Sequence, residues 1–299
     1  MGVGERRTQP SASAEGVARA RAAHQLIDDP KVFDDPLAVR ILGGDATSLA
    51  SEWREARSPF ASSLRAFLAV RSRVAEDEVA AAYERGIRQY VVLGAGLDTF
   101  GYRNPFPDLQ TVEVDQPGTQ SSKRARLAAT GIAVPASVSF VPLDFATGDL
   151  AEALARHADG RAARRIFSWL GVTPYLDRAT VSAVLGSIAS LGGDGADVVF
   201  DYMRPPSALD PMRRAAFDQL LQRLDAAGEP FRTFLEPSEI SAELRDLGFQ
   251  AVTDWGPEEL NATYFSNRAD GLRVGTLGHV VVARRDGSGP PRPPGSLLT

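Results

Sequence analysis

A glycine-rich turn and two acids on the following apolar run are the residues of this chain best suited to binding a ligand. Residues 89–103 read QYVVLGAGLDTFGYR, with Gly94 and Gly96 in the turn, and the later run QTVEVD closes on Glu113 and Asp115. The glycines let a ligand approach the backbone, and a carboxylate at the end of the second strand can accept hydrogen bonds from a ribose. The pattern indicates a site for an adenosine-containing cofactor.

The residue that follows the two glycines distinguishes between two kinds of cofactor. A dinucleotide fingerprint needs a small residue three positions after the second glycine, so that a helix N-terminus can meet the pyrophosphate. That position is Thr99. This disfavours NAD and favours S-adenosylmethionine, which has no phosphates. The alternatives are a nicotinamide oxidoreductase and an ordinary tight turn.

The composition argues against several other classes of protein. The chain has 299 residues, 43% hydrophobic and 24% charged, which suits one large globular domain. Its net charge of −5 comes without a basic stripe, so we expect a small-molecule substrate and neither nucleic acid nor membrane as partner. There is no cysteine, and His24, His157 and His279 lie far apart, which predicts no metal site.

Three further expectations concern the chain as a whole. The N-terminal residues contain no apolar leader and no later stretch is long enough to span a bilayer, so we expect a cytoplasmic protein. The oligomeric state stays open, with a homo-oligomer among the alternatives. Polar residues 1–15 and the Gly- and Pro-rich residues 285–299 are expected to be disordered.

Between these ends the pattern predicts one α/β domain over residues 16–284. It begins with a helical cap, residues 16–86, and contains a helical insertion, residues 203–235, that we interpret as a lid. We expect strands at Gln89–Leu93, Gln110–Val114, Ser137–Pro142, Arg165–Leu170, Asp197–Asp201, Phe249–Asp254 and Thr276–Ala283. Seven strands with the last one antiparallel would form the doubly wound sheet of class I methyltransferases, which binds ligands outside the carboxyl ends of its strands.

Six segments in order give the chain a family resemblance. They are RAAHQLIDDPKVFDDPLAVRIL, RSRVAEDEV, VVLGAGLDTFGYR, VEVDQP with a following lysine, LDF and WLGVTPYL. Together they resemble the leucine carboxyl methyltransferase-like family of S-adenosylmethionine-dependent O-methyltransferases, which includes bacterial members of polyketide and other secondary metabolism. The resemblance implies S-adenosylmethionine as cofactor and methyl transfer as activity. One departure is Leu170, where many relatives carry glutamate, so a polar contact at the methionine end is missing.

The resemblance also implies residues for the methionine end of the cofactor. Arg71 would pair with the methionine carboxylate, for which a guanidinium fork is well suited. Arg21 would close on the same end, and Gly94 and Gly96 would pass under the methionine portion. The alternative for Arg71 is a solvated helix face.

The adenosine end is assigned in the same way. Asp115 would accept hydrogen bonds from the ribose hydroxyls, with Glu113 as the alternative if the strand register is shifted. Asp144 would accept from the adenine amino group while Phe145 contacts the base. The alternative for Asp144 is an N-cap of the next helix.

Methyl transfer needs alignment and exclusion of water more than it needs a base, so we assign no catalytic residue. The three histidines are poorly placed as bases, which favours a carboxylate acceptor over a hydroxyl. The residues expected to line the acceptor pocket are Trp169, Thr173, Tyr175, Tyr202, Met203, Tyr264, Phe265 and Arg268. For the aromatic residues the alternative is packing in the core. A non-catalytic cofactor-binding protein of the same fold is a further alternative, supported by Leu170 alone.

Overall fold

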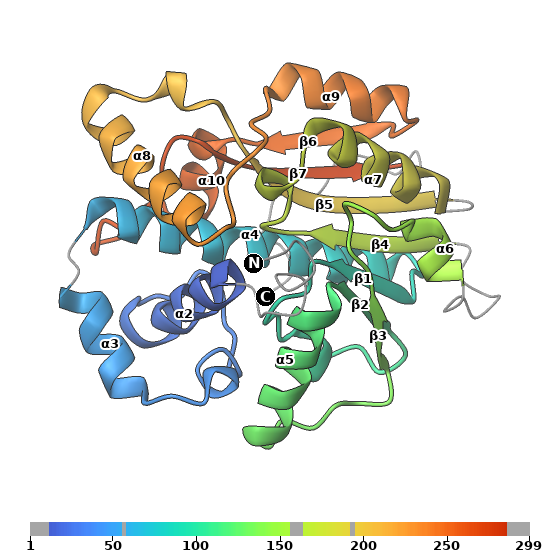
Figure 1. The fold of residues 1–299 in the computed structure, drawn as a ribbon, viewed down its shortest axis with the longest axis horizontal. Coiled ribbons are helices and arrows are strands. Elements are labelled where there is room, and N and C mark those ends of the chain that lie inside the picture. Colours follow the sequence, from blue (N-terminus) through green and yellow to red (C-terminus); the bar gives the residue numbers. More distant parts are fainter. Residues whose placement is uncertain (1–11, 56–57, 156–163, 192–194, 286–299) are drawn as a thin grey trace.

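A seven-stranded mixed sheet forms the centre of the molecule (Figure 1). The computed structural model describes residues 12–55, 58–155, 164–191 and 195–285. The strands are β1 Gln89–Leu93, β2 Gln110–Asp115, β3 Val138–Pro142, β4 Arg164–Trp169, β5 Gly195–Met203, β6 Ala251–Trp255 and β7 Gly278–Arg284. Their order is β3-β2-β1-β4-β5-β7-β6, with β1 to β5 paired in parallel and β7 antiparallel to both β5 and β6. The predicted doubly wound sheet with an antiparallel last strand is confirmed.

Each predicted strand is present; β1 has the predicted ends, and the ends of the others differ from the prediction by at most two residues. The largest difference is in β5, which we expected to end at Asp201 and which continues to Met203. The continuation pairs Tyr202 with His279 and Met203 with Gly278 on β7. Pairing with a strand from the far end of the chain therefore sets this boundary, and the local sequence carries no signal for it.

The helices surround the sheet and several begin with proline. They are α2 Ala12–Ile27, α3 Ala46–Glu55, α4 Pro59–Glu84, α5 Pro117–Ala129, α6 Leu150–Ala155, α7 Arg178–Leu191, α8 Pro211–Ala226, α9 Pro237–Asp246 and α10 Pro257–Tyr264, with 3₁₀ turns η1 Arg40–Leu42, η2 Phe100–Tyr102, η3 Thr173–Tyr175 and η4 Pro206–Ala208. Proline suits the first helical position because its missing N–H would have no partner there. At the other end of α4, Gly86 has a φ of 89°, the left-handed conformation expected after a helix.

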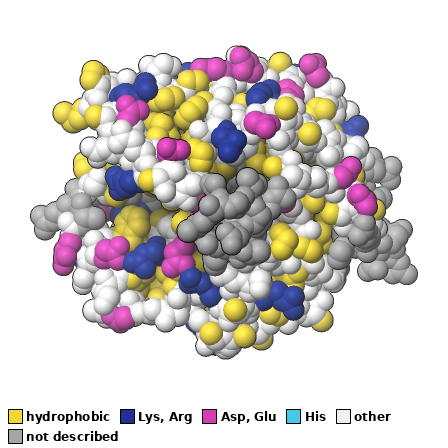
Figure 2. Space-filling model, viewed as in Figure 1, with side chains coloured by type: hydrophobic (Ala, Val, Ile, Leu, Met, Phe, Trp, Pro, Cys, Tyr) yellow, Lys and Arg dark blue, Asp and Glu magenta, His cyan; other side chains and the backbone are white. Residues whose placement is uncertain are grey.

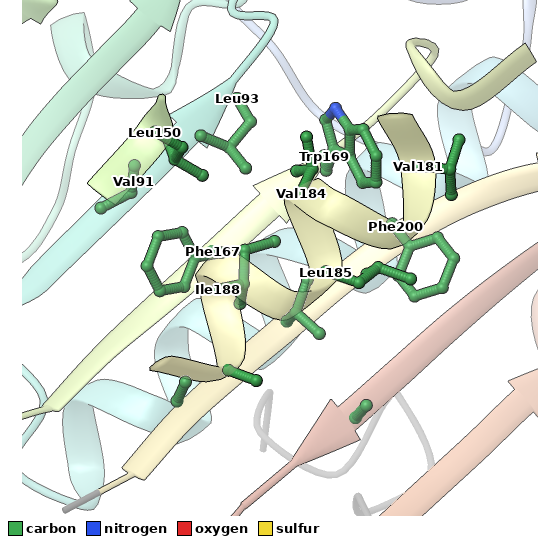
Figure 3. Packing of buried hydrophobic residues seen from close by; sticks show 14 of the residues in the cluster. Val91, Leu93, Leu150, Phe167, Trp169, Val181, Val184, Leu185, Ile188 and Phe200 are labelled. Carbon is green, nitrogen blue, oxygen red and sulfur yellow. The ribbon is translucent and has the colours of Figure 1, made fainter. Parts of the chain in front are cut away.

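The core consists of two apolar layers, one on each face of the sheet. Alternating residues of β1 separate them, since Val91 and Leu93 belong to one layer and Val92 to the other. The first layer is covered by α6, α7 and α9, and Figure 3 shows side chains of α7 packed over Phe167 and Phe200. The second is covered by α4 and α10. These covering helices leave the carboxyl ends of the parallel strands open, and a ligand site can form there.

The N-terminal boundary differs from the prediction. Helix α2 begins at Ala12, so the expected disorder over residues 1–15 is wrong for residues 12–15. In the sequence these small residues resemble a linker. In the structure one of them, Ala14, lies against the glycine turn, since a Cβ built at Gly96 would be 3.3 Å from Cβ of Ala14. Residues 1–11 and 286–299 lie outside the described part of the chain. Arg285, the first residue of the predicted tail, donates its N–H to the Ala196 carbonyl at 3.1 Å.

Figure 2 shows basic and acidic side chains interspersed on the visible face. Across the helices that the structure describes, none combines the length and apolar character needed to cross a bilayer.

Candidate functional site

A cavity of about 710 Å³ opens at the carboxyl ends of the parallel strands. It lies where the strand order reverses, between β1 and β4, which is where doubly wound sheets bind their ligands. Its wall includes residues of helix α2, helix α4 and the turn after β1, together with residues 227–230 and Arg232. Seven of the eight residues predicted to bind the cofactor line it: Arg21, Arg71, Gly94, Gly96, Asp115, Asp144 and Phe145.

The turn after β1 favours glycine at two positions. Gly94 has a φ of 67° and Gly96 a φ of 45°, a region that residues with a side chain rarely occupy. A Cβ at Gly94 would lie 2.2 Å from Cγ2 of Val172 on the facing loop. The turn therefore exposes its backbone to the cavity, which fits a cofactor that needs close approach.

Asp115 lies at the end of β2 with its carboxylate fixed by the backbone. Its Oδ2 accepts from the Gly96 N–H at 2.5 Å, and its Oδ1 accepts from the Gln116 N–H at 2.7 Å. Burial raises the pKa of this carboxyl, and the two N–H donors oppose the rise. The result is a preoriented acceptor in the cavity wall.

Glu113, the alternative to Asp115, does not line the cavity. It lies further inside the sheet, opposite Phe140, and its Oε2 is 2.7 Å from Nζ of the buried Lys123. The Tyr102 hydroxyl donates to the same oxygen at 3.0 Å. Burial raises the pKa of Glu113. This ion pair attaches α5 to β2. It holds the Glu113 side chain away from the cavity.

Asp144 and Phe145 follow β3. Oδ1 of Asp144 accepts from the Ala146 N–H at 3.0 Å within a turn. The alternative that Asp144 caps the next helix is wrong, because Asp149 accepts from the N–H groups at the start of α6. The Phe145 ring packs at 6.3 Å from the Trp169 ring, measured between centroids.

Two arginines reach the cavity from the N-terminal helices. Arg71 on α4 is 5% exposed, so the alternative of a solvated face is wrong. Its Nη1 donates to Oδ2 of Asp201 at 2.7 Å. Arg21 on α2 donates to Asp98 at 2.9 Å and to Asp35 at 2.7 Å. Both side chains are therefore held by carboxylates at the wall of the cavity.

Of the predicted acceptor-pocket residues, Tyr175 lines the cavity and three others are core residues. Trp169 is fully buried beside Phe200 (Figure 3). Thr173 donates its hydroxyl to the Asp201 carbonyl at 2.7 Å, and Tyr202 donates to Asp254 at 2.5 Å. Trp169 lies within β4, as the predicted strand Arg165–Leu170 already implied. Tyr202 was expected beyond the end of β5 and lies within it, and Thr173 turns inward to bond β5.

The remaining residues predicted for the acceptor pocket do not line this cavity either. Met203, Tyr264 and Phe265 pack in the apolar layer under α4. Arg268 lies at a separate hollow of about 390 Å³, where it donates to Asp270 and to the Pro30 carbonyl at 2.5 Å. The segment before β7 folds against α10 and the loop after α2, away from the strand ends.

Sequence reasoning missed two parts of the wall. One is the small-residue face of α2, which includes Ala14 and Val17; the other is the loop after α8, which includes Glu229 and Arg232. The two meet where the Ser13 N–H donates to Oε2 of Glu229 at 2.7 Å. A helix start hidden among small residues gave no signal, and the turn at Gly228 and Pro230 was read only as part of a lid.

The two described histidines are structural and do not line the cavity. Nε2 of His24 accepts from the Val32 and Phe33 N–H groups at 3.1 and 3.2 Å, so its proton is on Nδ1 and is donated to Asp28. Nδ1 of His279 lies 2.8 Å from Asp254. His157 is outside the described residues. Within the described ranges, no three acidic or histidine side chains are grouped to hold a metal ion.

Comparison with known proteins agrees with this geometry. A protein named "Putative S-adenosyl-L-methionine-dependent methyltransferase YktD" from Bacillus subtilis is 31% identical over 66% of this chain and 66% of its own length. A Mycobacterium avium protein with the same description is 32% identical over 72% of this chain and 71% of its own. A solved structure titled as a methyltransferase from Thermobifida fusca shares the fold, with a TM-score of 0.54 and 18% identity over 93% of this chain and 95% of that one.

The family model for leucine carboxyl methyltransferase matches residues 14–189, more than half of the chain. These residues include the glycine turn, Asp115 and two of the cavity arginines, Arg21 and Arg71. The chain belongs to the leucine carboxyl methyltransferase family of S-adenosylmethionine-dependent methyltransferases.

Proposed function

We propose that this protein transfers the methyl group of S-adenosylmethionine to a carboxylate oxygen of a small-molecule acceptor, forming a methyl ester. The observation that supports this best is the single cavity wall on which the glycine turn, Arg71 and Asp115 meet while neither described histidine reaches it. An ionised carboxylate needs no base, whereas a phenol, with a pKa of about 10, would benefit from a base that removes its proton.

The residues of the cavity fit the cofactor at each end. Gly94 and Gly96 leave the backbone open, Asp115 presents carboxylate oxygens to ribose hydroxyls, and Arg71 presents guanidinium N–H groups to a carboxylate. Asp144 and Phe145 would hold the adenine. When bound, S-adenosylmethionine supplies a methyl group already activated by its sulfonium.

The protein aligns the acceptor with the methyl group and excludes water from the reaction. Tyr175, the small-residue face of α2, residues 227–230 and Arg232 enclose the remaining part of the cavity. Holding the acceptor oxygen in line with the methyl carbon can lower the barrier by about 7–11 kcal/mol. No side chain has to move a proton for this reaction.

Arg232 is the residue we propose to orient the acceptor carboxylate, in place of Arg268. It lies at the cavity rim, is exposed, and comes from the loop that closes against α2. Of the other arginines of the wall, Arg71 is assigned above to the cofactor carboxylate, and Arg21 is already paired with both Asp35 and Asp98. Tyr175 contacts Phe231 with ring centroids 5.1 Å apart, which gives this end an apolar side for the body of an organic acid.

The test uses the lability of the product. The protein is incubated with tritium-labelled S-adenosylmethionine and a panel of small carboxylic acids, each beside the matching alcohol or phenol. We expect label only with acids, released as volatile methanol in mild alkali, because esters hydrolyse there and ethers do not. Label that resists alkali would favour the alternative, a hydroxyl O-methyltransferase.

The pH dependence separates the same two alternatives. With an accepted acid, single-turnover methylation should be nearly flat between about pH 6 and 8, well above a carboxyl pKa of about 4. A rate that rises tenfold per pH unit, or that is abolished in His24→Ala, His157→Ala or His279→Ala with cofactor affinity intact, would contradict carboxyl methylation.

Other parts of the proposal rest on the sequence. They are a role in secondary metabolism, a cytoplasmic location, the absence of nucleic-acid and membrane partners, and the action of residues 203–235 as a lid. The contact between Glu229 and the start of α2 supports the lid, since it joins the two sides of the cavity.

A further inference from the structure

We propose that Asp201 is a positioning residue, which sets the guanidinium of Arg71 at the methionine end of the cofactor without touching the cofactor itself. This inference rests on the proposed role of Arg71. Asp201 lies near the end of β5, its side chain is 1% exposed, and it is absent from the cavity wall that Arg71 lines.

The carboxylate of Asp201 uses one oxygen for each of two partners. Oδ2 accepts from Nη1 of Arg71 at 2.7 Å, and Oδ1 accepts from the Gly171 N–H at 2.5 Å. Arg71 comes from α4 and Gly171 from the loop after β4. One buried carboxylate therefore fixes a side chain of the helical cap and the loop at the end of a sheet strand in a single geometry.

Gly171 allows the Arg71 guanidinium to approach the backbone of the loop closely. Its φ is 72°, and a Cβ built there would lie 2.7 Å from Nη2 and 3.1 Å from Nη1 of Arg71. The guanidinium thus lies against the backbone of the loop, with both terminal nitrogens next to Gly171. A larger residue would push the guanidinium away from the position that Asp201 sets.

A guanidinium held in this way keeps donors for a ligand. Arg has five N–H donors, and Asp201 accepts from one nitrogen of Arg71. Without the carboxylate, the buried side chain would lose its partner and its fixed direction, because no other ion pair is found for Arg71 among the described residues. Affinity for the ligand carboxylate would then fall, while affinity for the adenosine part would not.

The experiment compares two ligands that differ in the group Arg71 would bind. S-adenosylhomocysteine carries the amino-acid carboxylate, and methylthioadenosine has the same adenosine and sulfur without it. By titration calorimetry, Asp201→Asn should lower the affinity for S-adenosylhomocysteine by about tenfold or more and change the affinity for methylthioadenosine little. Arg71→Ala should show the same selectivity, and the double variant should lose no more than Arg71→Ala alone.

Asp197→Asn is the matched control. Asp197 is on the same strand, is equally buried and pairs with Arg85, but it lies outside the cavity wall. We expect it to alter neither affinity. If Asp201→Asn is too unstable to measure, Gly171→Ala displaces the same guanidinium and should again weaken S-adenosylhomocysteine selectively.

Each contrary result has a distinct meaning. If Asp201→Asn or Gly171→Ala weakens both ligands equally, or neither, while Arg71→Ala is selective, Asp201 is merely structural and the inference is wrong. If Arg71→Ala leaves S-adenosylhomocysteine binding unchanged, the proposed cofactor role of Arg71 fails, and the inference fails with it.

Discussion

At the residue scale, Asp115 and Glu113 show how two carboxylates on one strand come to different roles. They are two positions apart on β2; Glu113 is buried and Asp115 is half-buried. Glu113 still faces a neighbouring strand and Lys123, whereas Asp115 is at the strand end, where backbone N–H groups take the place of a basic partner. Position relative to the end of the sheet, more than residue type, decides which acid is available to a ligand.

The first prediction follows from this difference. Asp115→Ala should weaken binding of S-adenosylhomocysteine by about 1–3 kcal/mol, because ribose hydroxyls would be left without acceptors. Titration calorimetry measures this directly. Glu113→Gln is the control on the same strand: it should lower the free energy of unfolding, since Lys123 loses its partner, and leave affinity unchanged. Equal losses of affinity in the two variants would show that Asp115 acts through the fold.

At the element scale, a buried group of charges attaches α2 to the turn after β1. Asp35 accepts from Arg21 at 2.7 Å and from the Thr99 hydroxyl at 2.7 Å, and lies 3.3 Å from Arg103. Arg103 in turn pairs with Glu76 on α4. The network joins the helical cap to residues next to Gly96, so the cap and the cofactor site depend on one another.

The second prediction tests that dependence. Asp35→Asn should destabilise the protein by about 1–3 kcal/mol, because Arg21 and Arg103 each lose one carboxylate partner and keep the other, Asp98 and Glu76 respectively. It should also increase amide hydrogen exchange in α2 and lower the affinity for S-adenosylhomocysteine. Asp34→Asn is the neighbouring control, since the Asp34 side chain is 74% exposed and, among the described residues, its ion pair is with Lys31 at 3.3 Å. The free energy of unfolding of this control variant should stay within about 0.5 kcal/mol of that of the parent protein. An equal effect of the two substitutions would contradict the proposed coupling.

Local patterns predicted the sheet and most of the cofactor end of the cavity. Apolar runs such as Gln89–Leu93 specify strands through period and length, and the spacing of glycines and acids follows strand ends. The acceptor end could not be predicted in this way. It depends on where β5 stops, at Met203 instead of Asp201, and on the docking of α2 against Glu229, both of which are set by contacts between distant parts of the chain.

At the scale of the whole molecule, family membership removes two of the alternatives left by the sequence. The nicotinamide oxidoreductase and the non-catalytic binding protein are wrong, because the chain belongs to a family of S-adenosylmethionine-dependent methyltransferases. Leu170, which had supported a non-catalytic protein, is in the cavity wall beside Gly171. The buried carboxylate of Asp201 accepts a hydrogen bond from the Gly171 N–H in this loop.

The stability of the whole molecule also depends on how the cap is attached to α4 at Asp28. Oδ2 of Asp28 lies 2.7 Å from Nδ1 of His24, and Arg65 on α4 donates to both carboxylate oxygens at 2.8 and 2.9 Å. Burial alone would raise the pKa of Asp28, but the hydrogen bonds from His24 and Arg65 outweigh it and hold the pKa below its usual value. The folded state therefore favours the ionised carboxylate.

The last prediction concerns the pH dependence of global unfolding. Because the pKa of Asp28 is lower in the folded state, its stabilisation is complete above the unfolded pKa of about 4 and is lost as the pH falls through the folded value. Asp28→Asn should thus lower the free energy of unfolding by about 1.5–3 kcal/mol at pH 7, and parent and variant should converge below about pH 4. Urea unfolding at pH 7, 5 and 3 measures the difference, with the exposed neighbour Asp29→Asn as control. A difference that stays constant from pH 5 to 3 would mean that Asp28 stabilises the cap through its shape and neutral hydrogen bonds, and that its charge contributes nothing.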